Sequence, residues 1–213
     1  MKVLIIGAHG KVGRLLVDEL QTRKIDFVAG LRNQEQIEAY QAENIPTQYI
    51  DLTAPAAEIK ESISQSGADT IVFSAGAGGA GYDLTMEIDL DGAIKTMVVS
   101  QELGIKRYIM VSAVYSDDRS KWDASGIRPY YIAKHYADKY LRGTDLDYTI
   151  VHPGTLTDAT ATGKIKIQTN REGGSVSRGD VAKVIAQTIE TPSTIKRDYN
   201  FVSGDEKISE VVK

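Results

Sequence analysis

The sequence predicts an α/β protein built on a doubly wound parallel sheet. Short apolar runs alternate along the chain with stretches whose apolar residues have helical spacing. The central runs are continuously apolar, which is typical of parallel strands covered on both faces. The first run also passes directly into a glycine-rich turn and then into a helix.

Composition narrows the class of protein. The chain has 213 residues, 42% of them hydrophobic and 25% charged, enough for one sizeable core in a single domain. Its net charge of -4 gives no reason to expect nucleic acid or an anionic membrane as a partner. No apolar run approaches the length of a membrane span or a signal peptide. The absence of cysteine excludes disulfides and thiol catalysis and favours a reducing cytoplasm. We expect a cytoplasmic monomer or homodimer whose partner is a small-molecule substrate.

Apolar runs give the expected strands in order. They cover residues 2–6, 25–31, 47–50, 70–74, 108–112, 148–151 and 199–202. A parallel arrangement with right-handed crossovers predicts the order 3-2-1-4-5-6 for the first six, with a ligand where the order reverses. The segment 154–177 breaks the alternation and includes Lys164-Ile165-Lys166-Ile167, a candidate short antiparallel strand. We expect this segment to be a small lid over the substrate.

Helices fall between these runs, and several carry end signals. Asn33 with Gln36 resembles a capping pair, and Ser177 with Asp180 resembles another. Thr53 followed by Pro55 predicts a helix start, with Gly67 as its end. Longer helices are expected over 84–103 and 130–141.

The turn after the first strand is Gly7-Ala8-His9-Gly10-Lys11-Val12-Gly13. A diphosphate can approach backbone N–H groups at a helix start only where no side chain blocks it. We expect Gly7 to permit the tight turn, Gly10 the close approach of phosphate, and Gly13 the packing of helix on strand. His9 is expected to act through its backbone N–H, beside Lys11 and Val12. The turn therefore predicts a Rossmann-type dinucleotide site, the alternative being a tight strand-to-helix turn without a ligand.

The end of the second strand indicates which coenzyme is bound. Sites selective for NAD place a carboxylate there to bind the ribose 2′-OH. Residues 29–33 contain no carboxylate, and Arg32 suits a 2′-phosphate. The sequence therefore favours NADP over NAD.

Two further strand ends contribute to the same predicted edge of the sheet. Asp51 and Leu52 follow the third strand and are placed to meet adenine, although Asp51 can equally start the next helix. Ser74, Ala75 and Gly76 follow the fourth strand, where small residues let the backbone pass close to the coenzyme.

The chain resembles the short-chain dehydrogenase/reductase superfamily over nearly its whole length, and within it the atypical branch that includes epimerase/dehydratase-like and biliverdin/flavin-reductase-like members. The resemblance is carried by the glycine turn, by Asp51-Leu52, by Val111-Ser112-Ala113, and by Asp89, which stands where extended members have Asn. Val151-His152-Pro153-Gly154 resembles an Arg-Pro-Gly motif, with His152 in place of Arg.

The resemblance implies a tyrosine and a lysine four residues apart on one helix face. Tyr130 and Lys134 have that spacing and follow the fifth strand. By analogy, Lys134 binds the nicotinamide ribose and lowers the phenol pKa, and Tyr130 exchanges the proton; Tyr131 is an alternative. The superfamily's serine falls near Ser112, although Ala113 can occupy its place, leaving Ser116 as a substitute.

The remaining candidates are fewer. His152, at a strand's carboxyl end, can contact nicotinamide or serve as a hydrogen-bonded structural residue. No two histidines have ligand spacing, so we expect no metal site. The predicted function is an NADP(H)-dependent oxidoreductase for a small carbonyl, quinone or flavin-like substrate. The alternatives are an epimerase or dehydratase, which usually needs a larger substrate region after Pro153, and a non-catalytic NADP(H) sensor.

Overall fold

The computed structural model describes residues 1–170 and 172–213. Within this part, a nine-stranded sheet has the order β11-β8-β10-β6-β5-β4-β1-β2-β3. The strands are β1 (Lys2–Ile6), β2 (Asp26–Leu31), β3 (Thr47–Tyr49), β4 (Thr70–Phe73), β5 (Arg107–Val111), β6 (Asp147–Pro153), β8 (Lys164–Ile167), β10 (Arg197–Ser203) and β11 (Glu206–Lys207). The predicted order 3-2-1-4-5-6 is confirmed, and β10 adds a seventh parallel strand beside β6.

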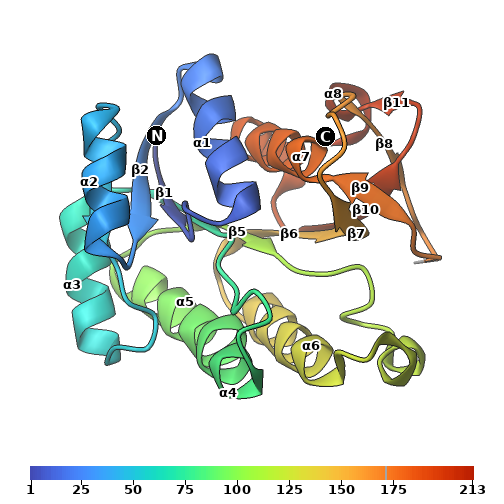
Figure 1. The fold of residues 1–213 in the computed structure, drawn as a ribbon, viewed down its shortest axis with the longest axis horizontal. Helices are drawn as coiled ribbons and strands as arrows, with labels where there is room; N and C mark the ends of the chain where they lie inside the picture. Colours follow the sequence, from blue (N-terminus) through green and yellow to red (C-terminus); the bar gives the residue numbers. More distant parts are fainter. Residues whose placement is uncertain (171) are drawn as a thin grey trace.

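Helices cover both faces of this sheet (Figure 1). They are α1 (Lys11–Arg23), α2 (Gln34–Ala42), α3 (Ala56–Ser66), α4 (Tyr82–Leu84), α5 (Ala93–Glu102), α6 (Arg128–Arg142), α7 (Arg178–Glu190) and α8 (Ile208–Val211). Helices α1 and α7 lie on one face, and α5 and α6 lie on the other. None of the helices in the described ranges is both long and apolar enough to span a membrane.

The first strand shows why its apolar run is unbroken. Val3 and Ile5 pack into the core under α1 and α7, whereas Leu4 and Ile6 pack into the core under α3, α5 and α6. Strand β1 pairs in parallel with β2 on one side and β4 on the other. Both faces of the strand are therefore buried, so alternation with polar residues is absent.

Local signals place several helix ends correctly. The Asn33 side chain accepts hydrogen bonds from the N–H groups of Glu35 and Gln36 at the start of α2, and the Ser177 hydroxyl accepts from Asp180 at the start of α7. Gly67 ends α3 in the left-handed conformation, at φ 63°. The predicted start of α3 is shifted, because Thr53 bonds the Asp51 carboxylate and the helix begins after Pro55.

The predicted helix over residues 84–103 is interrupted in its geometry. Residues Thr85–Gly92 form a π-helix between α4 and α5, a rare conformation that often accompanies functional sites. This wide segment carries Asp89, whose side chain is almost wholly buried.

The segment 154–177 is only partly separate from the sheet; residue 171 within it lies outside the described residues. Strand β8 is antiparallel to β10, as the sequence predicts. Strands β7 (Thr155–Thr157) and β9 (Ser175–Ser177) pair with each other in a small parallel ladder.

The glycine turn depends on close backbone contacts. A Cβ atom at Gly13 would lie 2.3 Å from the Gly7 carbonyl oxygen, and one at Gly7 would lie 2.7 Å from the Ala75 backbone. Gly7 also has φ 89°, which disfavours any side chain. A Cβ at Gly10 meets only the Gly7 carbonyl oxygen, at 3.2 Å.

These contacts predict unequal costs for alanine at two glycines of one turn. Gly13→Ala should lower the free energy of unfolding by about 2–3 kcal/mol, because backbone must move. Gly10→Ala should cost under about 1 kcal/mol, since its φ of -62° suits any residue. Urea denaturation of the two variants checks this, and equal losses would contradict it.

Candidate active site

The crevice at the carboxyl ends of β1, β2, β3 and β4 has two hollows. One, of about 250 Å³, lies along the glycine turn and the ends of β2 and β3. The other, of about 890 Å³, extends from the glycine turn to α6. The two hollows share four lining residues, Gly10, Ser74, Ala75 and Gly76. They therefore adjoin where the strand order of the sheet reverses.

Helix α1 begins at this crevice without a side-chain cap. Gly10 is its N-cap residue, and no acidic residue occupies the first turn. The first backbone N–H groups of a helix lack partners within the helix and carry partial positive charge. Gly10 leaves the space above them open. The turn therefore fits a diphosphate, as its spacing predicts.

The smaller hollow brings together the residues predicted for an adenosine phosphate. Arg32, whose side chain is exposed, lines it together with His9, Asp51 and Leu52. The Asp51 carboxylate accepts hydrogen bonds from the N–H and hydroxyl of Thr53, so it serves the turn as well as the hollow wall. Arg14 contacts the His9 ring. The pKa of His9 is lowered, mainly by burial and secondly by the positive charge of Arg14. Neutral His9 adds no charge beside Arg32.

Sequence reasoning missed several wall residues. Ile50, Ile88 and Gln36 also line the smaller hollow, and Thr85, Leu156 and Arg178 line the larger one. Ile50 ends a strand that was predicted, but Ile88 and Thr85 come from the π-helical segment, which the sequence does not signal. Arg178 is recognisable only as the first residue after the Ser177 cap.

Lys134 projects from α6 into the larger hollow and is almost wholly buried. Its Nζ lies 2.9 Å from Asp89 Oδ1 and donates to the Val111 carbonyl oxygen at 3.2 Å. The other Asp89 oxygen accepts from the Ala77 N–H at 2.8 Å. Burial alone would lower the Lys134 pKa, but Asp89 and then Tyr130 outweigh it, so the pKa is raised. Lys134 stays charged and is held by a carboxylate.

Tyr130 lines the same hollow, with its ring centroid 5.6 Å from Lys134 Nζ. Burial raises the pKa of its phenol; Lys134 lowers it, and Asp89 and Asp138 raise it again. The net direction is upward. Lys134 by itself lowers the phenol pKa, as the resemblance implies. Burial and Asp89 oppose it, so the net lowering that the resemblance implies is not found. At neutral pH Tyr130 is therefore protonated and suited to donate a proton.

The alternative tyrosine is placed elsewhere. Tyr131 packs with Ala113 and Trp122 in a separate apolar cluster and does not line the hollow. Burial raises its pKa to about 12. Of the two neighbours, Tyr130 alone lines the hollow.

Ser112 lines the hollow too, but its hydroxyl donates to Asp138 Oδ2 at 2.5 Å. The hydroxyl is therefore committed to the helix behind it. Ser116 is fully buried and contacts His152, so it does not replace Ser112. The structure thus brings Tyr130 and Lys134 together but leaves the predicted serine role without a free hydroxyl.

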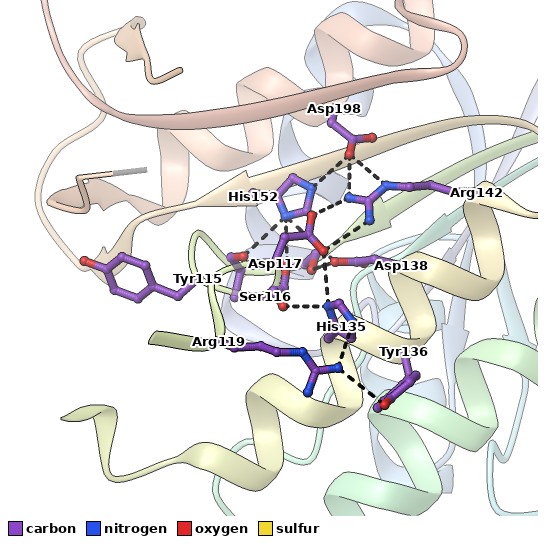
Figure 2. Close-up of polar contacts among 12 residues, drawn as sticks. Tyr115, Ser116, Asp117, Arg119, His135, Tyr136, Asp138, Arg142, His152 and Asp198 are labelled. Carbon is purple, nitrogen blue, oxygen red and sulfur yellow. Dashed lines mark hydrogen bonds and ion pairs between the residues drawn. The ribbon is translucent and has the colours of Figure 1, made fainter. Parts of the chain in front are cut away.

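His152 does not reach the crevice. Its side chain is fully buried and its Nδ1 lies 3.1 Å from Ser116 Oγ and 3.3 Å from the Ala113 carbonyl oxygen (Figure 2). Of the two roles predicted for it, the geometry favours the hydrogen-bonded structural one. Helix α6 contributes to this placement, because its Asp138 Oδ2 lies 3.8 Å from His152 Nδ1.

Asp117 and Asp198 flank His152 closely enough to suggest a cation site. Arg142, however, lies between them (Figure 2). Its Nη2 is 2.7 Å from Asp117 and 2.5 Å from Asp198. Burial would raise the Asp198 pKa, but His152 and Arg142 lower it overall. The guanidinium already satisfies both carboxylates, and this network fastens α6 to β10.

These features define a dinucleotide-binding α/β protein with a tyrosine–lysine pair at the crossover of its sheet. The chain belongs to the NAD(P)H-binding family, which it matches over residues 7–192, within the atypical short-chain dehydrogenase/reductase-like superfamily. The family includes oxidoreductase-like and epimerase-like proteins.

Individual relatives agree with this assignment. The chain is 39% identical to a Bacillus subtilis protein named as an uncharacterized sugar epimerase, YhfK, covering 100% of this chain and 99% of YhfK. The structure of the Lactococcus lactis oxidoreductase ylbE is 34% identical, with a TM-score of 0.89 and coverage of 100% and 95% of the two chains. ChuY of Escherichia coli O157:H7, an anaerobilin reductase, is 23% identical, with a TM-score of 0.80 and coverage of 97% and 99% of the two chains, and shows a shared fold.

The charges around Tyr130 yield a prediction that needs no substrate. Asp89→Asn should lower the Tyr130 pKa, because Lys134 loses its counterion; Lys134→Met should raise it. Tyrosinate absorbance during alkaline titration reports the change. Because the chain has 11 tyrosines, each titration is compared with the same variant carrying Tyr130→Phe. Shifts in the same direction for both variants would contradict this electrostatic account.

Proposed function

We propose that this protein is an NADP(H)-dependent oxidoreductase that reduces a small carbonyl, quinone or flavin-like substrate. One observation carries the proposal: Tyr130 and Lys134 line the same hollow as the uncapped start of α1. A nicotinamide coenzyme, when bound, supplies the hydride. The protein's own residues must hold it, orient the substrate and deliver a proton.

The coenzyme contacts follow the crevice. Gly7 and Gly10 form the diphosphate cradle with Lys11 and Val12, while Gly13 lets α1 pack on the turn, and Ser74, Ala75 and Gly76 form the opposite backbone wall. Lys134 would bind the ribose hydroxyls of the coenzyme while remaining paired with Asp89. Arg32 supports NADP over NAD, because its guanidinium is exposed in the smaller hollow.

The reducing direction rests on the protonation of Tyr130. A phenol whose pKa is raised keeps its proton at neutral pH and can give it to a developing oxyanion. With Ser112 bonded to Asp138, Tyr130 is the group proposed to polarise a substrate oxygen. A quinone or flavin ring needs less acid assistance than an isolated carbonyl, which suits so sparse a donor set. Leu156 and its segment 154–177 are proposed as the substrate lid.

An epimerase or dehydratase is the second candidate, because the relative YhfK is named as an uncharacterized sugar epimerase and a similar Bacillus halodurans structure as a putative NAD-dependent epimerase/dehydratase. Such an enzyme would return the hydride to its product and show turnover without net coenzyme oxidation. An NADP(H) sensor would bind coenzyme and show neither activity. NADPH oxidation measured against quinones, flavins and aldehydes identifies an oxidoreductase, and product analysis of nucleotide sugars incubated with the coenzyme separates an epimerase or dehydratase from a sensor. Failure of calorimetry to detect NADPH binding at near-millimolar concentration would remove the proposal altogether.

Arg32→Gln should raise the NADPH dissociation constant about 10- to 100-fold and leave that for NADH within about twofold, because only NADPH presents a phosphate to the guanidinium. Calorimetry measures both constants. Arg197→Gln removes another exposed arginine, from β10, and serves as the control. Equal weakening of NADH and NADPH would contradict the assigned role of Arg32.

Tyr130→Phe should lower kcat for an aldehyde about 10²- to 10⁴-fold, since a positioned acid is lost. NADPH affinity should stay within about twofold. Reduction of a quinone should fall far less than that of the aldehyde. Tyr131→Phe, the matched control, should retain wild-type rates, because Tyr131 packs away from the hollow. Comparable losses for the two variants would rule out the assignment to Tyr130.

A further inference from the structure

Two cationic residues, Lys11 and Arg178, line the larger hollow, whereas Arg32 lines the smaller one. Lys11 is the first residue of α1 and Arg178 the first of α7, and these two helices pack side by side (Figure 1). Both side chains line the hollow that also contains Tyr130. They therefore face the region where coenzyme and substrate would meet.

A single carboxylate bridges these cations. Asp158, from the segment after β7, places Oδ2 3.3 Å from Lys11 Nζ and Oδ1 2.6 Å from Arg178 Nη1. Its side chain is 69% exposed, whereas that of Arg178 is only 19% exposed. The hydrogen bond from Lys11 is the main cause that lowers the Asp158 pKa. The Asp158 carboxylate thus lies between the first residues of α1 and α7. Because the ion pairs are exposed to water, another anion can readily replace it.

The charge balance around Lys11 and Arg178 favours another anion. The buried carboxylate of the hollow, Asp89, is committed to Lys134 and the Ala77 N–H. Among the described residues, Asp158 is the one carboxylate paired with Lys11 and Arg178, and the uncapped start of α1 adds partial positive charge. An anion that replaced Asp158 would meet two cations already spaced for two oxygens.

We propose that Lys11 and Arg178 form an anion subsite for phosphate or carboxylate oxygens, which Asp158 occupies until a ligand displaces it. The ligand can be the coenzyme diphosphate or an acidic group on the substrate, and this choice rests on the proposed function. In either case, Asp158 directly follows β7, the strand that carries Leu156 in the wall of the substrate hollow. Binding at the subsite is thus linked to the wall of the substrate hollow.

Calorimetry with inorganic pyrophosphate at constant ionic strength tests the subsite without coenzyme. Arg178→Met and Lys11→Met should each weaken pyrophosphate binding about five- to tenfold, because one charged contact is lost. Asp158→Asn should tighten binding about two- to fivefold, because the competing anion is removed. Lys183→Met is the control, since this lysine lies on α7 but pairs with Glu19 outside the hollow.

Two further titrations identify the source of the anion. If it is the coenzyme, NADPH affinity follows the same order among the variants. If it is the substrate, NADPH affinity is unchanged, and NADP⁺-saturated protein prefers FMN to riboflavin, a preference that Arg178→Met abolishes. These two flavins differ only by a phosphate.

The proposal is overturned if pyrophosphate, NADPH and FMN affinities all stay within twofold in Arg178→Met and Asp158→Asn. It is also overturned if Lys183→Met weakens pyrophosphate binding as much as Arg178→Met does. Loss of the proposed function looks different, because wild-type protein would then fail to bind NADPH while the pyrophosphate titration still reported on the subsite.

Discussion

The buried ion pair between Lys134 and Asp89 is the interaction on which the rest of the active site depends. It joins α6 to the π-helical segment, and through the Ala77 N–H it also fixes the loop after β4. A lysine this deeply buried requires a partner, because an unpaired charge there would cost several kcal/mol. Asp89, which stabilises the charge of Lys134, also opposes the lowering of the Tyr130 pKa by Lys134. This pair therefore determines where the lysine lies, and burial together with Asp89 keeps the neighbouring phenol protonated.

Asp89 also limits how closely backbone can approach. A Cβ atom at Gly76 would lie 2.8 Å from Asp89 Oδ1, so the position of the ion pair requires glycine at that strand end. At Gly92, the last residue of the π-helical segment, a Cβ would lie 3.0 Å from the side chain of Leu52, which lines the smaller hollow. The wide helical segment thus touches both halves of the crevice.

The sequence predicts the architecture and the first contacts of the site because these depend on local patterns. Unbroken apolar runs indicate doubly covered strands, the glycine spacing indicates the cradle, and the four-residue spacing of Tyr130 and Lys134 indicates a shared helix face. The side chains of Asn33 and Ser177 cap their helices by accepting from backbone N–H groups two or three residues further along, so these caps too can be predicted from the sequence.

Residues whose roles depend on distant partners could not be predicted. The Ser112 hydroxyl and the His152 ring are directed by Asp138, which arrives with α6, and by Asp198, which arrives with β10. No sequence pattern near Asp158 predicts that Lys11, 147 residues earlier in the chain, lies beside it. The π-helical geometry of Thr85–Gly92 has no sequence signal that we recognise.

The two margins of the sheet have a consequence for the molecule in concentrated solution. Strand β3 spans only Thr47–Tyr49, and β11 spans only Glu206–Lys207, so each margin exposes a very short row of unpaired backbone groups. A strand from another molecule would find few hydrogen-bonding positions at either margin, and at β11 it would meet charged side chains. Such margins resist the intermolecular strand addition that leads to aggregates.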